Sequence, residues 1–212
     1  MSDFSARRVM MVDTQVRPSD VTKFPIIAAM LAVPREAYVP HSKSEAAYVG
    51  ENLEIGNGRV MVEARTLAKM LEALDVQPSD RALYIAGGLG YGAAVLGRML
   101  ASVVMVESDA GLAGAAQATL GAGKVSVVTG PLEAGAAGSY NVILIEGGVQ
   151  QVPEALLAQL AEGGRIAAIF MQGALGSVQI GHKADGRVTW RFSFNATAPI
   201  LPGFAKAAAF AL

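Results

Sequence analysis

The chain of 212 residues contains no cysteine, which excludes disulfide bonds and thiolate metal sites and favours a reducing, cytoplasmic location. Its two histidines, His41 and His182, are too few for a typical histidine-built metal site, so we expect no metal. No apolar run reaches the roughly 18 residues of a membrane span. The opening segment MSDFSARRVMM lacks the apolar core and cleavage site of a secretory signal, which again favours the cytoplasm.

Charged residues are also scarce, and their signs balance. They make up 17% of the chain and leave a net charge of −1, with a pI near 6.1. Such a balance offers no basic field, and we expect no nucleic-acid partner. Hydrophobic residues make up 52%, enough for a sizeable core in a single domain of this length. The composition leaves the oligomeric state open.

Short, continuously apolar runs alternate with helix-like stretches between residues 82 and 170. Such runs are typical of parallel strands that are buried on both faces. The alternation predicts an α/β fold with a doubly wound, Rossmann-like, mostly parallel sheet. The expected strands are Ala82–Ile85, Val103–Glu107, Val125–Thr129, Val142–Glu146 and Arg165–Phe170. The expected helices between them are Ala93–Leu100, Ala110–Leu120 and Pro153–Leu160.

A helical lobe is expected before this sheet. Ser5–Gln15 and Phe24–Ala32 are the first two helical segments, and the second is stopped by Val33-Pro34. Between Val60 and Leu74 the apolar residues recur at helical spacing and form one stripe. The segment Tyr48–Asn57 is expected to be an irregular loop that leads into this third helix.

Antiparallel strands are expected after the sheet. Val188, Trp190, Phe192 and Phe194 alternate with polar residues, which predicts a strand with one buried face. The dipeptide Asp185-Gly186 is a hairpin signal that joins this strand to Val178–His182. Lys206 to Leu212 is a further candidate strand that would close the sheet.

The most informative segment is the turn that follows Ala82–Ile85. It reads Ala86-Gly87-Gly88-Leu89-Gly90-Tyr91, and its glycines let the backbone approach a ligand and expose amides at a helix N-terminus. Glu107 ends the next strand, where an acid accepts hydrogen bonds from ribose hydroxyls. The pattern therefore predicts a nucleoside-bearing cofactor at this edge. A plain tight turn beside a solvated acid is the alternative.

Several segments, taken in order, resemble the protein-L-isoaspartate O-methyltransferases. The matching segments are Pro34-Arg35-Glu36, Leu53 to Gly58, Tyr84 to Tyr91, Val106-Glu107, Tyr140 to Ile145 and Val152 to Arg165. The resemblance implies a class I enzyme that uses S-adenosylmethionine to methylate a carboxylate of a protein or peptide. It implies one domain over residues 1–212, with a lobe and substrate loop in 1–75 and a cofactor-binding core in 76–212. The implied cofactor-binding residues are Ile85, Ala86, Gly87, Gly88, Gly90, Tyr91, Glu107 and Gly130.

The departures from the family pattern lie at its polar positions. Val62 stands where the family's substrate loop carries a serine, and Gly130 stands where an acid faces the adenine. Tyr84 replaces the acid that opens the cofactor motif, and Ala86 replaces its first glycine. These losses predict weak or absent isoaspartyl methylation, although a carboxylate is already ionised at neutral pH and needs no general base.

Two charged residues beside Val62 are candidate substrate contacts in place of the serine. Arg59 could pair with a substrate carboxylate, and Glu63 could supply an equivalent contact from a shifted loop. A solvated loop arginine is the alternative for Arg59. Tyr84 and Trp190 are most simply aromatic core residues.

Three hypotheses about function remain. The first is a working methyltransferase on protein or peptide carboxylates, and the second is a family member that serves as a non-catalytic interaction or regulatory protein. The third is an NAD-dependent oxidoreductase, because Gly88 to Ala93 also satisfies the pattern G-x-G-x-x-G/A. We rank it last, because that fingerprint belongs near the start of its fold and about eighty residues precede it here.

Overall fold

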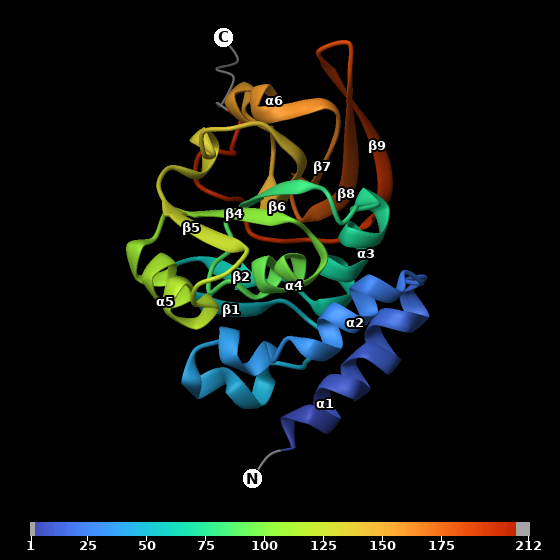
Figure 1. Cartoon of the computed structure of the whole chain (residues 1–212), viewed down its shortest axis with the longest axis vertical. Coiled ribbons are helices and arrows are strands. Elements are labelled where there is room, and N and C mark those ends of the chain that lie inside the picture. Colours follow the sequence, from blue (N-terminus) through green and yellow to red (C-terminus); the bar gives the residue numbers. More distant parts are fainter. Residues whose placement is uncertain (1–2, 207–212) are drawn as a thin grey trace.

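The computed structural model describes residues 3–206 and is built on one seven-stranded sheet (Figure 1). Its strands lie in the order β5 (Val125–Thr129), β4 (Ser102–Glu107), β3 (Arg81–Ile85), β6 (Tyr140–Val149), β7 (Leu160–Gln172), β8 (Leu175–Ala184) and β9 (Arg187–Asn195). The first five are parallel, and β8 and β9 are antiparallel. The predicted α/β class, the mostly parallel sheet and the antiparallel C-terminal strands are confirmed.

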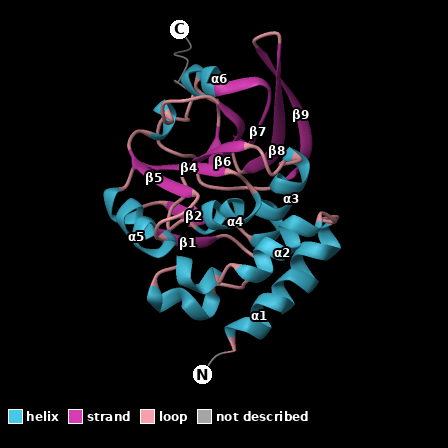
Figure 2. Ribbon diagram, in the orientation of Figure 1, coloured by secondary structure: helices cyan, strands magenta, loops and turns pink. Residues whose placement is uncertain are grey.

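Helices cover the two faces of the sheet unequally (Figure 2). One core cluster packs against the N-terminal and central helices: α1 (Phe4–Met11), α2 (Phe24–Ala32), α3 (Ala64–Leu74), α4 (Tyr91–Met99) and α5 (Ala110–Leu120). The other cluster packs against α6 (Glu154–Gln159) and the chain near Leu201 and Phe204. Alternate residues of β3 divide between the clusters, since Tyr84 belongs to the first and Leu83 to the second. Burial on both faces explains the continuously apolar strand sequences.

The N-terminal lobe departs from expectation at a hairpin. β1 (Leu53–Gly56) pairs antiparallel with β2 (Arg59–Met61), so the segment expected as an irregular loop is partly a strand. The turn Asn57-Gly58 has positive φ at both residues, 53° and 71°, which suits a two-residue hairpin. Because Val60 and Met61 pair with β1, the helix expected from Val60 begins only at Ala64.

The first helix also ends earlier than expected. α1 stops at Met11 and continues as a π turn, Val12–Val16, and a 3-10 turn, Arg17–Ser19. α2 has the predicted bounds. Two further 3-10 segments, Arg35–Tyr38 and His41–Ala46, lead to β1, and a third, Leu132–Ala134, follows β5.

The C-terminal hairpin forms at Asp185-Gly186 as predicted, but its apolar side chains divide between two faces. The register of β8 and β9 shifts at a bulge, because Val178 lies opposite Phe194 and Gln179 opposite Phe192, which leaves Ser193 of β9 as the extra residue. Trp190 therefore packs with one core cluster, its ring 4.8 Å from that of Phe170, whereas Phe194 packs with the other. Phe192, expected on the buried face, is 65% exposed. Of the strand expected from Lys206 to Leu212, all but Lys206 lies outside the described residues.

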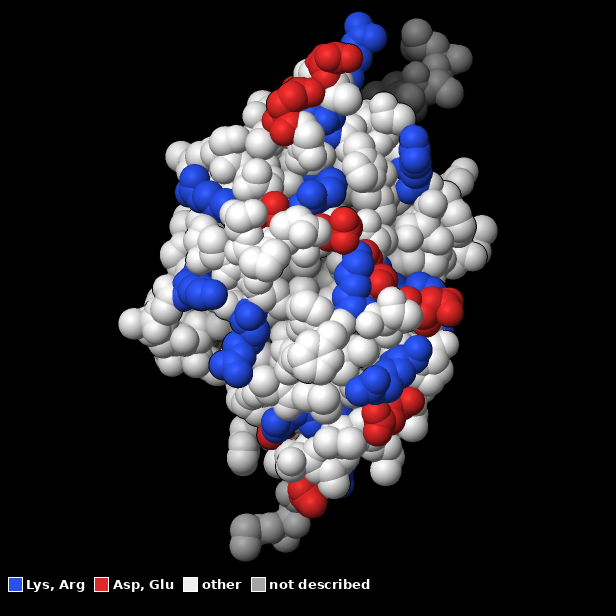
Figure 3. All heavy atoms as spheres, turned by 45° about the vertical axis from the view of Figure 1, so that its right-hand side comes forward, with Lys and Arg blue, Asp and Glu red and all other residues white. Residues whose placement is uncertain are grey.

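Acidic and basic side chains are interspersed over the face of the molecule in Figure 3, in keeping with the net charge of −1. Among residues 3–206, no helix combines the length and the apolar composition needed to span a membrane.

Ala86 has an unusual backbone conformation for its residue type. It follows β3, its N–H donates to the Val106 carbonyl at 2.9 Å, and its φ is +62°. Among residues 3–206, the other non-glycine residues with positive φ are aspartates and an asparagine, which tolerate this region. A methyl group therefore stands at a left-handed position that favours glycine.

We expect Ala86→Gly to change the free energy of unfolding by less than about 1 kcal/mol. Relief of the left-handed alanine, about 1–2 kcal/mol, offsets the lost methyl group and the greater freedom of the unfolded chain. The matched control is Ala113→Gly in α5, where the alanine is equally buried at 2% exposure but helical. This control should lose about 1.5–2 kcal/mol in a urea titration. Equal losses in the two variants would show that Ala86 is unstrained.

Candidate functional site

The carboxyl ends of the parallel strands meet at one edge, and the glycine turn lies there. β3 and β4 pair in register, with Ile85 opposite Val106, so Glu107 emerges beside the turn. Gly88 and Gly90 have positive φ, 55° and 97°, and Gly90 caps α4. The structure thus brings the turn residues expected for cofactor binding, Ile85 to Tyr91, together with Glu107. Gly130 lies next to them, because its N–H donates to the Glu107 carbonyl at 3.1 Å.

The carboxylate of Glu107 is fully buried, with 0% exposure. Its Oε2 accepts from the Gly88 N–H at 2.9 Å, and its Oε1 accepts from the Asp109 N–H at 3.0 Å. Oε1 also forms an ion pair with Nη2 of Arg59 at 2.5 Å. The acid predicted to bind a ligand is therefore held by groups of its own chain.

Arg59 is buried rather than solvated, so the alternative of an exposed loop arginine is wrong. It is 5% exposed, and its Nη2 also donates to the Ser108 hydroxyl at 3.1 Å. A third contact joins the β1–β2 hairpin to the residues after β4, because Asn57 Nδ2 donates to Asp109 Oδ2 at 2.6 Å. The hairpin is thus attached to residues 107–109 by three polar contacts, two from Arg59 and one from Asn57.

An apolar contact closes the space between the hairpin and the glycine turn. The Cδ1 atom of Ile55, on β1, lies well within contact distance of the position that a Cβ on Gly88 would take, so there is no room for a side chain at Gly88. The pocket between Ile55, Met61, Gly87 and Leu89 is too narrow for a water molecule. In Figure 1 the hairpin is labelled between the sheet and the blue N-terminal segment, so it covers this edge.

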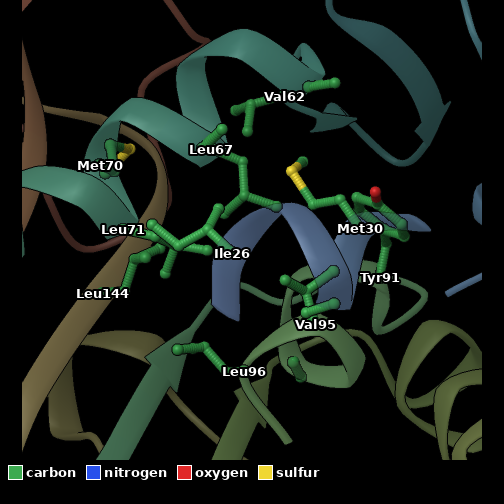
Figure 4. Packing of buried hydrophobic residues seen from close by; sticks show 14 of the residues in the cluster. Ile26, Met30, Val62, Leu67, Met70, Leu71, Tyr91, Val95, Leu96 and Leu144 are labelled. Carbon is green, nitrogen blue, oxygen red and sulfur yellow. The ribbon is translucent and has the colours of Figure 1, made fainter. Parts of the chain in front are cut away.

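Val62, at the position of the expected serine, is part of the hydrophobic core. Its side chain is 1% exposed and lies in the same cluster as Met30 and Leu67 (Figure 4). Its backbone is held on both sides: the N–H donates to Glu146 at 3.1 Å, and the carbonyl accepts from Arg35 Nη2 at 2.7 Å. A side chain in this position points into the hydrophobic core.

Glu146, near the middle of β6, is a second buried carboxylate that the sequence reasoning did not single out. It is 4% exposed and accepts from the Tyr84 hydroxyl at 2.7 Å as well as from Val62. Burial raises the pKa of Glu146 to about 7, against these two hydrogen bonds, which lower it. The usable signal was an acid at the end of an apolar run, as at Glu107. Tyr84 is buried as expected, but its hydroxyl serves this acid.

Glu63 borders a different, open cleft. Its Oε1 accepts from the Thr66 hydroxyl at 2.7 Å and from Arg65 at 2.9 Å, and its N–H donates to Asn52 at 3.0 Å. The cleft has a volume of about 650 Å³ and is lined by residues 50–52, 63, 65, 175–176 and 195–197. Glu63 and Arg59, paired as candidate substrate contacts from sequence, thus face different surroundings.

Comparison with known proteins gives a consistent result. The family model for protein-L-isoaspartate(D-aspartate) O-methyltransferase matches residues 8–193. The chain is 34% identical over 193 residues to the protein-L-isoaspartate O-methyltransferase of Koribacter versatilis (strain Ellin345), covering 89% of this chain and 87% of that one. It is 40% identical over 114 residues to that of Methylorubrum extorquens (strain PA1), a match that spans 54% of this chain and only half of the relative.

A solved structure shares the fold. It is described as such a methyltransferase from Plasmodium falciparum in complex with S-adenosyl-L-homocysteine. The TM-score is 0.79 at 16% identity, over 95% of this chain and 99% of that one.

The buried Glu146 should make stability depend on pH. Its pKa in the folded protein, about 7, lies above the ordinary 4.5, so its contribution is complete at low pH and is lost as pH rises through about 7. Titratable groups around it are Tyr84 on β3, Arg35, Tyr91 on α4 and Glu107 on β4. We expect the free energy of unfolding to fall by up to ~3 kcal/mol between pH 4.5 and 8 from this group.

The measurement is chemical denaturation across this range in the wild type, in Glu146→Gln and in the surface control Glu51→Gln. The fall should disappear in Glu146→Gln, which stays neutral, and persist in the control. Parallel profiles for the wild type and Glu146→Gln would contradict the assignment.

Restoring the expected serine should damage the core rather than rebuild a site. Val62→Ser places a hydroxyl among apolar side chains and removes buried methyl groups, so we expect a loss of about 2–3 kcal/mol of stability. Val60→Ser, on the less buried neighbouring position of β2, is the control and should lose less. Thermal unfolding of both variants measures the difference, and a harmless Val62→Ser would place that side chain outside the core.

Proposed function

The chain belongs to the protein-L-isoaspartate O-methyltransferase family, and from that premise we propose that it methylates carboxylates of proteins or peptides with S-adenosylmethionine as donor. The observation that carries the proposal is the approach of the Gly88 N–H to Glu107, 2.9 Å, at the carboxyl edge of the sheet. Doubly wound sheets bind nucleotide ligands at this edge, with the glycine turn on the phosphate or methionine side and the acid on the ribose. The related Plasmodium falciparum structure is described with the demethylated cofactor.

The side chains around the turn do not fit this donor as they stand. Arg59 and the Asp109 N–H already occupy Oε1 of Glu107, and the pocket over Gly87 is too narrow for water. The backbone frame of a donor site is therefore present, but its space is filled and one oxygen of its acid is occupied. Donor binding requires Arg59 to give up this oxygen and Ile55 to leave the space over Gly88.

Methyl transfer to a carboxylate requires little from the protein beyond positioning of the donor and the substrate. A substrate carboxylate is ionised at neutral pH, so no general base is needed. Holding two reactants in line is worth up to about 7–11 kcal/mol in intramolecular analogues. We assign the peptide to the open cleft beside Glu63, where Asn52 and the half-exposed Arg65 offer polar contacts to a backbone or a carboxylate.

Isoaspartyl activity is expected to be weak. Val62 has no hydroxyl and faces the core, so the loop contact of the family pattern is missing. Arg59, which could compensate, is bound to Glu107. We further propose a cytoplasmic location, on the ground that the chain has no cysteine to protect or to oxidise.

A second function is supported by the same closed edge. A family member that serves as a non-catalytic interaction or regulatory protein has no need of an open donor site, and a buried Glu107 paired within the chain suits that role. The two functions differ in one measurable property, which is binding and use of the donor.

The test is methyl transfer from radiolabelled S-adenosylmethionine to an isoaspartyl peptide and to a mixture of carboxylate-bearing proteins. We expect the peptide rate to lie at least a hundredfold below that of the Koribacter versatilis relative assayed alongside, since each lost hydrogen bond to a charged group costs about 1.5–3 kcal/mol. A rate equal to that relative's would overturn the expected weakness. Absence of transfer to every acceptor, together with no donor binding, would favour the non-catalytic role.

A further inference from the structure

We propose that the β1–β2 hairpin is an internal plug, in which Arg59 occupies the face of Glu107 that the ribose hydroxyls of a donor need. The donor site at the glycine turn is then closed in the resting protein and opens only when Arg59 is displaced. The inference rests on the proposed function, because it concerns the same acid and the same glycine turn. It adds a contact that keeps the donor site closed.

The acceptor capacity of Glu107 is the first support. A carboxylate recognises a ribose by accepting from two neighbouring hydroxyls, one on each oxygen. Here Oε1 already accepts from Arg59 and from the Asp109 N–H, and Oε2 accepts from Gly88. With 0% exposure, Glu107 has no free face that points to solvent. The Arg59 guanidinium therefore occupies an oxygen of Glu107 that a ribose hydroxyl would use.

The plug is fixed at further points besides the ion pair. Asn57 at its tip donates to Asp109 at 2.6 Å, and Ile55 covers Gly88. Its far end continues into Val62, whose backbone is held by Glu146 and Arg35. Residues 55–62 are thus anchored along their length, and one of the anchors is the contact that a donor must replace.

One detail shows that the guanidinium is only partly satisfied in this position. Nη1 of Arg59 is buried and has no hydrogen-bond partner among the described residues. A buried N–H without a partner is costly. Exchange of Arg59 for a ligand is therefore less unfavourable than it would be from a fully satisfied site. The contact fits a plug that can be released better than a permanent structural pair.

A closed resting state lowers the apparent affinity of any ligand for the donor site at the glycine turn. Only the open fraction binds, so the apparent Kd is the intrinsic Kd divided by that fraction. Weakening the plug should raise the affinity without adding any contact to the ligand. A ligand-site residue would show the opposite sign on substitution.

The test compares wild type, Arg59→Gln and the matched control Arg17→Gln by calorimetric titration with S-adenosylhomocysteine. The control removes the same type of side chain from an exposed ion pair with Asp13 and leaves every contact of the hairpin in place. We expect Arg59→Gln to bind at least about tenfold tighter than wild type and Arg17→Gln to stay within about threefold. Equal affinities of wild type and Arg59→Gln would overturn the plug and leave the proposed function standing.

Amide hydrogen exchange without ligand separates the two proposals. In Arg59→Gln, exchange at residues 53–61 and at Gly88 should rise above wild type, and unchanged exchange there would overturn the plug. Faster exchange with no binding by any variant would support the plug and reject the donor. If Arg59→Gln does not fold, wild type with saturating S-adenosylhomocysteine replaces it: exchange should rise at 53–61 and fall at 86–90. A fall at both segments would mean that the hairpin stays in place over the ligand, against the plug.

Discussion

The structure of the sheet edge at the glycine turn depends on one constraint: the carboxylate of Glu107 is completely buried and must be paired. An unpaired buried charge is expensive, and a buried pair is tolerable only when hydrogen bonds satisfy the remaining lone pairs. Arg59 supplies the charge, and the Gly88 and Asp109 amides supply the hydrogen bonds. The partner comes from a hairpin 48 residues earlier in the chain, so satisfying this acid also fixes the hairpin over the sheet edge.

A second buried acid extends the same arrangement. Glu146 holds the backbone of Val62, three residues beyond Arg59, and takes the hydroxyl of Tyr84. The segment 59–62 is therefore held by two carboxylates, each from a parallel strand of the sheet. This explains why Val62 faces the core although it occupies the position of a substrate-loop serine. Tyr84, in place of the family's acid, adds to the internal network rather than to a ligand site.

The fold was largely predictable from residue patterns, and the exceptions have physical reasons. Continuous apolar runs that alternate with helix-like stretches predicted the parallel sheet, because both faces of such a sheet are covered. The β1–β2 hairpin was missed although Asn57-Gly58 is a strong turn signal, since the helical spacing further along drew Val60 into the wrong element. The division of Trp190 and Phe194 between two faces was also missed, because a bulge changes register without leaving a pattern in the sequence.

The sequence by itself determined the sheet, the glycine turn, the acid at the end of β4 and the family. All of these follow from local patterns: apolar runs, glycines that permit a tight turn, and motifs in a fixed order. Only the tertiary structure decided that Arg59 pairs with Glu107, that Glu146 is buried beside Val62 and that Ile55 covers Gly88. A sequence specifies which charged residues a chain contains, whereas folding determines which of them are buried next to one another. The partner of each buried charge therefore depends on long-range packing that local patterns do not encode.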